Sequence, residues 1–138
     1  MKYASNFCLL KEGRSRYEDR KSVFLGFAFP IQTEEEVKTH LDRLRHEYSD
    51  ANHLVYPYFL EDGHLSRYSD DSEPQGTAGL PCLSVIQAKQ LRGALVAVIR
   101  YFGGTLLGTG GLTKAYGTCA KDALENAGIA QLVPFYRC

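Results

Sequence analysis

The chain has 138 residues, the length of one domain that can bury a core without metal or disulfide staples. Its 16 basic and 16 acidic residues give a formal net charge of zero, which excludes an overall field drawing it to nucleic acid or anionic membrane. No apolar run reaches bilayer-spanning length, so we expect neither a membrane-spanning segment nor a membrane partner.

The first third of the chain predicts a β-hairpin. Residues 7–10 are apolar and predict a short strand, and residues 12–15 predict the turn. Apolar residues then alternate with others over residues 23–29, the period of a half-buried strand. Pro30 ends this second strand.

A capping box begins the first predicted helix, since Glu36 follows Thr33 at a spacing of three. Its apolar stripe consists of Val37, Leu41, Leu44 and Tyr48. Beyond it, residues 52–60 predict a strand, residues 62–63 a turn and residues 64–68 a short partner strand. The sequence therefore predicts a second hairpin after the helix.

His53 stands where this helix gives way to the strand. It is either a structural histidine bonded to backbone or an acid–base and ligand-binding group. No second histidine stands at metal-ligand spacing from it, so no metal site is predicted there.

Residues 69–81 form a loop dense in turn-forming residues, with carboxylates at Asp70, Asp71 and Glu73. Three neighbouring carboxylates can hold a divalent cation through oxygen ligands. They can also accept backbone N–H bonds and cap a helix that begins near Thr77, which is the interpretation we prefer.

A glycine-rich stretch organises the last third of the chain. The apolar run at residues 95–99 predicts a strand covered on both faces, and helical spacing resumes at Leu112. Between them, after Arg100, stand Gly103, Gly104, Gly108, Gly110 and Gly111. Such a loop before a helix can hold a phosphate or carboxylate, with Arg100 and Lys114 nearby. The alternative is that the glycines only permit a tight reversal and close helix–sheet packing.

The predicted order is β-β-α-β-β-α-β-α, with a possible last strand at residues 131–136. This order favours an α/β (α+β) two-layer sandwich in which the helices pack on one face of a mixed sheet. The cysteines Cys8, Cys82, Cys119 and Cys138 include no C-x-x-C pair, so we expect reduced thiols in a cytoplasmic protein.

Two segments, residues 69–81 and 100–116, closely resemble the signature segments of the Impact family, whose bacterial members include YigZ. Residues 21–24 and 51–53 agree more weakly, so the resemblance covers nearly the whole chain. Ser72 departs from the pattern, because the family usually has glycine there. Many bacterial relatives also continue into a ferredoxin-like second domain, so residues 1–138 are expected to form a single Impact N-terminal domain without it.

The resemblance implies a fold like the second domain of ribosomal protein S5, a fold that serves both RNA binding and phosphoryl transfer. We expect a non-catalytic binding module, linked to translation regulation, with RNA or ribosome-associated factors as partners and no cofactor. The expected ligand-binding residues are Lys21, His53, Arg100, Gly103, Gly104, Gly108, Gly110, Gly111 and Lys114. One alternative is a regulatory protein-interaction module. Another is an enzyme on a small phosphorylated or carboxylated metabolite, using Asp70, Asp71 or Glu73 with His53.

Overall fold

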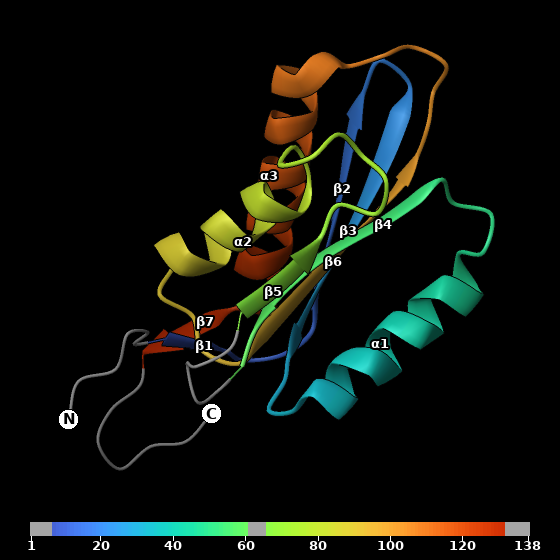
Figure 1. The fold of residues 1–138 in the computed structure, drawn as a ribbon. Helices are drawn as coiled ribbons and strands as arrows, with labels where there is room; N and C mark the ends of the chain where they lie inside the picture. The colour runs from blue at the N-terminus through green and yellow to red at the C-terminus, as the bar shows by residue number, and fades with distance from the viewer. Residues whose placement is uncertain (1–6, 61–65, 132–138) are drawn as a thin grey trace.

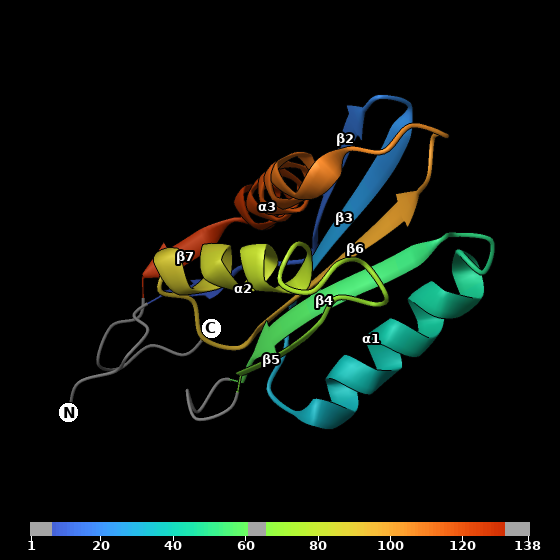
Figure 2. The same ribbon diagram turned by 45° about the horizontal axis from the view of Figure 1, so that its top comes forward.

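The computed structural model describes residues 7–60 and 66–131, and its centre is a five-stranded sheet. The strands in spatial order are β2 (Gly13–Asp19), β3 (Ser22–Pro30), β6 (Ala94–Tyr101), β4 (His53–Phe59) and β5 (Ser66–Ser69). Helix α1 (Glu34–Glu47) covers one face, and α2 (Gly79–Ala88) and α3 (Gly108–Ala127) cover the other (Figures 1 and 2). The α/β class is confirmed.

The expectation that the helices share one face is wrong, because α1 packs on the face opposite α2 and α3. The central strand β6 shows why. Leu95 and Ile99 join the core beneath α1, whereas Val96 and Val98 join the core beneath α2 and α3. A strand whose alternate residues are all apolar needs cover on both sides, so the domain has three layers.

The expected mixed sheet is also not found, since each pair of neighbouring strands in this sheet is antiparallel. The strands β5 and β6 are joined through α2 and run in the same direction. They lie on either side of β4, however, so this crossover connection creates no parallel pair.

The first hairpin lies later in the chain than predicted. Residues 13–19 form the strand β2, and the turn consists of Arg20 and Lys21, with φ of 47° and 68°. Two positive φ values in a two-residue connection define the type I′ turn, whose twist suits a hairpin. The predicted turn at 12–15 is wrong because β2 is a polar edge strand, which carries no apolar alternation.

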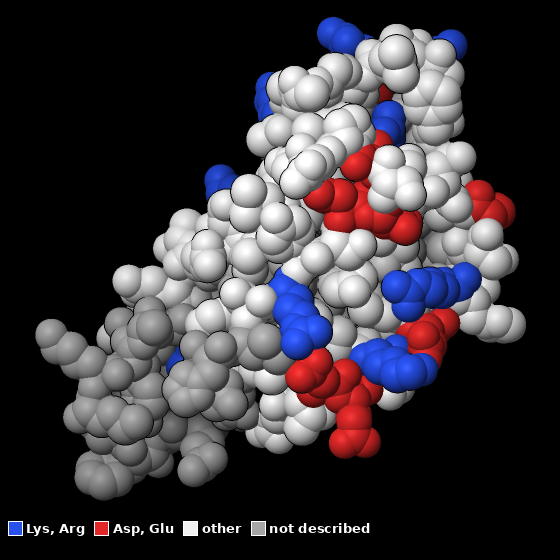
Figure 3. All heavy atoms as spheres, viewed as in Figure 1, with Lys and Arg blue, Asp and Glu red and all other residues white. Residues whose placement is uncertain are grey.

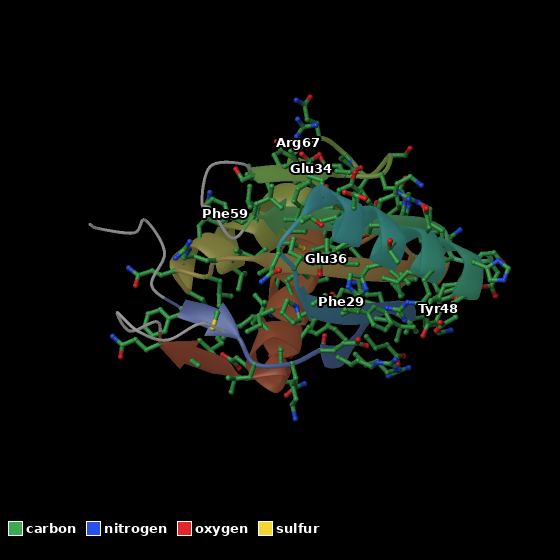
Figure 4. The ribbon with its side chains drawn as sticks, turned by 90° about the horizontal axis from the view of Figure 1, so that it is seen from below. Phe29, Glu34, Glu36, Tyr48, Phe59 and Arg67 are labelled. Atoms are coloured by element: carbon green, nitrogen blue, oxygen red, sulfur yellow. The ribbon has the colours of Figure 1, made fainter. Side chains whose placement is uncertain are left out.

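The helix α1 begins as predicted. Thr33 Oγ1 accepts a hydrogen bond from Glu36 N at 3.2 Å, and the reciprocal bond completes the capping box. Figure 4 shows α1 in front of the sheet, with Phe29 and Tyr48 at its margins. The His40 ring stacks on Phe29 at 4.0 Å between centroids, so both apolar and aromatic contacts fix this helix.

A second, two-stranded sheet joins β1 (Phe7–Leu9) to β7 (Ile129–Gln131). The predicted last strand shares only Gln131 with β7, and the rest of it lies outside the described residues. Cys82 and Cys119 are free and buried, whereas Cys8 is disulfide-bonded, so the expectation of a reduced thiol is wrong at Cys8. Within residues 7–60 and 66–131, no helix has the length and apolarity needed to cross a membrane.

Candidate functional site

A cavity of about 380 Å³ lies where the start of β4, the end of β6 and the start of α3 meet the loop before α2. Its polar lining includes His53, Glu73 and Arg100, and its apolar lining includes Phe102 and Leu106. It thus brings together one residue from each of the stretches that the sequence singled out: the His53 strand, the acidic loop and the glycine-rich segment.

The floor of the cavity is a buried ion pair. Arg100 Nη1 donates to both Glu73 oxygens, at 3.0 and 2.7 Å, and Arg100 Nη2 donates to Ser22 Oγ at 3.2 Å. Only 4% of Arg100 and 8% of Glu73 is exposed. The Tyr116 hydroxyl also donates to Glu73, so the buried charges are paired and hydrogen-bonded, as burial requires.

Burial raises the pKa of Tyr116 far above its usual value, and the bond to Glu73 raises it further. The hydroxyl is therefore a fixed donor. Within the described part of the chain, Arg100 Nε is the buried side-chain nitrogen or oxygen that has no hydrogen-bond partner. Ser22 was not a candidate from the sequence, because it stood in a strand pattern. Tyr116 stood on an apolar helical face, which predicted a core residue more than a contact with a ligand.

His53 makes the backbone contact that a structural histidine would make, and it also lines the cavity. Its Nδ1 lies 2.7 Å from the carbonyl oxygen of Asp71, which can only accept, so Nδ1 carries the proton in this bond. Its Nε2 lies 3.6 Å from Glu73 Oε1. In the neutral imidazole this leaves Nε2 as an acceptor beside the cavity.

The other two carboxylates of the acidic loop, Asp70 and Asp71, accept hydrogen bonds from backbone N–H groups. Asp70 Oδ1 accepts hydrogen bonds from the N–H groups of Ala78 and Gly79 at 3.2 and 2.8 Å, so Asp70 caps α2. Asp71 Oδ2 accepts from Leu54 N at 2.6 Å. The preferred sequence interpretation, capping, is confirmed at Asp70. No group of three His, Cys, Asp or Glu within residues 7–60 and 66–131 is placed to hold a metal ion.

The helix α3 begins earlier than predicted, at Gly108 instead of Leu112. Gly110 and Gly111 therefore belong to its first turn. Leu107 is the N-cap residue and makes no side-chain hydrogen bond to the helix. Among the described residues, no side chain accepts a hydrogen bond from the first N–H groups of α3, and Gly108 and Thr109 line the cavity.

Both interpretations of the glycines hold, at different positions. A Cβ on Gly103 would lie 2.1 Å from the backbone carbon of Lys21, so Gly103 permits close packing. Gly104 and Gly108 have φ of 93° and 74°, which favours glycine in a turn. Gly110 has open space around it, so neither packing nor a turn accounts for this glycine.

The two candidate lysines are exposed and do not line the cavity. Lys21 contributes its backbone, which packs on Gly103, and Lys114 lies on the solvent side of α3. Arg20 was missed, although its Nη1 donates to the carbonyl of Leu106 at 3.3 Å. Only a correct placement of the first hairpin could have indicated it, since the turn brings Arg20 to the glycine-rich segment.

Acidic atoms gather on the face seen in Figure 3, in the part where Figure 1 draws the loop between β5 and α2. Glu73 itself is buried against Arg100, whereas Asp71 of the same loop is exposed. The loop that contributes Glu73 to the cavity thus carries acidic charge, and an anion bound beside it would depend on directed hydrogen bonds.

Comparison with known proteins shows which proteins this chain is similar to. Residues 20–124 match the family described as the Impact N-terminal domain. IMPACT family member YvyE of Bacillus subtilis is 33% identical over 128 residues, which cover 92% of this chain and 59% of that protein. The IMPACT family member in pol 5'region of Thermus thermophilus is 43% identical over 114 residues, covering 83% and 61%. The chain thus spans about three fifths of the length of these relatives.

The fold also occurs in a solved structure, the crystal structure of a hypothetical protein. It aligns with a TM-score of 0.86 and 32% identity over 94% of this chain and 65% of that chain. The three-layer arrangement described above therefore has a crystallographic counterpart.

Proposed function

The chain belongs to the Impact family, and from that premise we propose that its domain is a non-catalytic module that binds a phosphate-bearing ligand such as RNA. One observation supports this most. The first turn of α3, which has no side-chain cap, lines the same cavity as Arg100 and His53. A phosphate there would accept hydrogen bonds from the N–H groups of Gly108 and Thr109.

The attraction would come from the helix terminus more than from full charges. The first N–H groups of a helix carry partial positive charge, roughly half an elementary charge in total. Arg100 is offset by Glu73 at 2.7 Å, so it adds a local donor to the site without a net positive charge. We therefore expect weak binding with a shallow salt dependence, as for a ligand that makes few phosphate contacts.

The resemblance to a family with members in translational control supports a place in that process, with RNA or ribosome-associated factors as partners in the cytoplasm. These roles belong to the proposal. The likeness to ribosomal protein S5 likewise stays a prediction.

The test is to titrate a labelled oligoribonucleotide with the wild-type chain at low and moderate salt, and then with Thr109→Asp. Thr109 is exposed in the first turn of α3, where an added carboxylate stabilises the helix by about 0.3–1 kcal/mol. The same carboxylate repels a bound phosphate. We expect affinity to fall at least about tenfold, which is about 1.4 kcal/mol.

The matched control is Thr39→Asp, which makes the same charge change at an exposed position of α1, on the opposite face of the sheet from the cavity. Its affinity should stay close to that of the wild type. Equal losses in the two variants would show only general repulsion and contradict a site at the helix terminus. Absence of salt-sensitive binding in the wild type would contradict phosphate recognition itself.

Lys114→Glu separates inorganic phosphate from a longer strand. Since Lys114 is exposed and outside the cavity, this variant should bind inorganic phosphate as the wild type does. It should bind an oligoribonucleotide less tightly, because a strand leaving the cavity can reach the outer side of α3. If Lys114→Glu binds both ligands with the affinity of the wild type, Lys114 is not part of the proposed site.

A further inference from the structure

The cavity has an apolar wall that a bare phosphate would not use. Phe102, Leu106 and Leu107 stand beside the polar floor of His53 and Glu73. Leu106 is 80% exposed and Phe102 is 46% exposed. Large apolar side chains exposed at the edge of a polar cavity are typical of a site whose ligand is itself partly apolar.

The backbone at each of these two exposed residues makes a hydrogen bond to another segment of the chain. The Phe102 N–H donates to Asn52 Oδ1 at 2.7 Å, and the Phe102 ring centroid lies 5.5 Å from Arg100 Cζ. The Leu106 carbonyl accepts the hydrogen bond from Arg20. The backbone that carries the apolar wall is therefore tied to the rest of the domain without a ligand, which lowers the backbone entropy lost on binding.

Two separate observations mark the anionic end of the cavity. One is the first turn of α3, which lacks a side-chain cap at Gly108 and Thr109. The other is Arg100, which lines the cavity, is 4% exposed and has an Nε–H with no partner among the described residues. The volume of about 380 Å³ lies within the range of roughly 300–1,000 Å³ usual for small organic ligands.

We propose that this cavity holds one nucleotide, either free or as an unpaired residue of an RNA strand. The inference rests on the proposed function, since the nucleotide phosphate occupies the position at the start of α3. The base stacks on the Phe102 ring and lies against Leu106. Because every base has a π face, such stacking tolerates any sequence. His53 Nε2 accepts a hydrogen bond from a ribose hydroxyl or a base amino group.

The experiment compares adenosine monophosphate, ribose 5-phosphate and inorganic phosphate by calorimetric titration of the wild-type chain. All three carry the anion, and only the first carries a base. Adenosine monophosphate should bind at least about fivefold more tightly than ribose 5-phosphate, the lower end of what base stacking on an aromatic ring contributes. Equal affinities would overturn the inference.

The variant is Phe102→Leu, which keeps an apolar side chain and removes the aromatic face. It should lower affinity for adenosine monophosphate to that for ribose 5-phosphate and leave inorganic phosphate unaffected. The matched control is Leu80→Ala, because Leu80 is a 41% exposed apolar residue on α2 outside the cavity. Unchanged nucleotide affinity in a folded Phe102→Leu chain would also overturn the inference.

Failure of this inference and failure of the proposed function give different results. One possible result is that the three ligands bind with equal affinity and Thr109→Asp weakens the binding of each. This result would support the phosphate site and contradict the base site. If none of the three binds and the oligoribonucleotide does not bind either, both proposals are lost.

Competition between adenosine monophosphate and an oligoribonucleotide distinguishes a free nucleotide from an unpaired residue of an RNA strand. A single-stranded oligoribonucleotide that binds much more tightly than adenosine monophosphate, and is displaced by it, indicates an unpaired RNA residue. Adenosine monophosphate binding at least as tightly as the strand indicates a free nucleotide. An RNA duplex should bind more weakly than the single strand in the first case, because its bases are already stacked.

Discussion

Glu73 and Arg100 are 27 residues apart in the chain, yet one nitrogen of Arg100 reaches both oxygens of Glu73 in the protein interior. The pair connects the loop before α2 to the end of β6. It therefore links the acidic loop to the central strand and forms the centre of the polar floor of the cavity.

Breaking the pair should be costly. Arg100→Met leaves the Glu73 carboxylate buried without its cation, and we expect a loss of about 3–5 kcal/mol in the free energy of unfolding. The double variant Glu73→Gln with Arg100→Met should recover much of this loss, because no buried charge remains. Urea denaturation measures both.

The control for this prediction is a surface pair. Lys38 Nζ lies 2.7 Å from Asp42 Oδ2, and both side chains are more than half exposed. Lys38→Met should cost at most about 1 kcal/mol. If Arg100→Met costs no more than that, the buried pair does not have the structural role assigned to it.

Two glycines of one segment should respond to alanine in opposite directions. Gly103→Ala places a Cβ against the backbone of Lys21 and should destabilise the domain by about 1–3 kcal/mol. Gly110 lies in a helix with open space around it, so Gly110→Ala should stabilise by up to about 1 kcal/mol.

Thermal unfolding distinguishes these two effects. Should Gly110→Ala stabilise the chain and also weaken phosphate binding, close approach of a ligand explains this glycine. Destabilisation by Gly110→Ala would instead indicate a packing role that the open space does not suggest.

Removing the cap of α2 should lower stability moderately. Asp70→Ala deprives the N–H groups of Ala78 and Gly79 of their acceptor, at an expected cost of about 0.5–2 kcal/mol. Asp70→Asn keeps one oxygen acceptor and should cost less. Equal losses for the two variants would show that charge, not the hydrogen bonds, accounts for the effect.

Tyr116 should make the fold sensitive to alkaline pH. Because burial raises the folded pKa of Tyr116 above the unfolded value of about 10, the unfolded state loses this proton first. Its contribution to stability is complete below about pH 10 and declines as pH rises from there toward the folded pKa.

The measurement is the urea midpoint of the wild type and of Tyr116→Phe at neutral pH and above pH 10. Tyr116→Phe should be less stable at neutral pH, where Glu73 loses a donor, and should show a smaller alkaline decline. Tyr68→Phe, at a 44% exposed position, is the control and should keep the wild-type slope. A slope unchanged by Tyr116→Phe would rule out Tyr116 as the cause.

The sequence predicted the parts of the fold that leave a periodic apolar pattern. The capping box at Thr33 and the doubly covered strand at residues 95–99 were both correct. The strand at residues 13–19 was missed because it is a polar edge strand, whose stability comes from backbone pairing with β3. The residue pattern of one β-strand carries little information about its pairing with a neighbouring strand.

Of the candidate site, the sequence indicated His53, Glu73 and Arg100 as separate residues and could not pair them. Their contacts depend on the order of strands in the sheet, which places β6 between β3 and β4. That order also brings Ser22 to Arg100. The start of α3 was misplaced because glycines at helix positions contradict helix propensity, and only the three-dimensional fold overrides it.

The pairing of Phe7 with Gln131 in the small sheet has a consequence for biosynthesis. A ribosome releases β1 before α3 and β7 only after α3 is complete, so the antiparallel pairing of β1 is delayed until the whole of α3 has been made. Contacts so distant in sequence close late and slow the folding reaction. The β1–β7 sheet should therefore form last, and a nascent chain halted before Ile129 should expose β1 to chaperones and proteases.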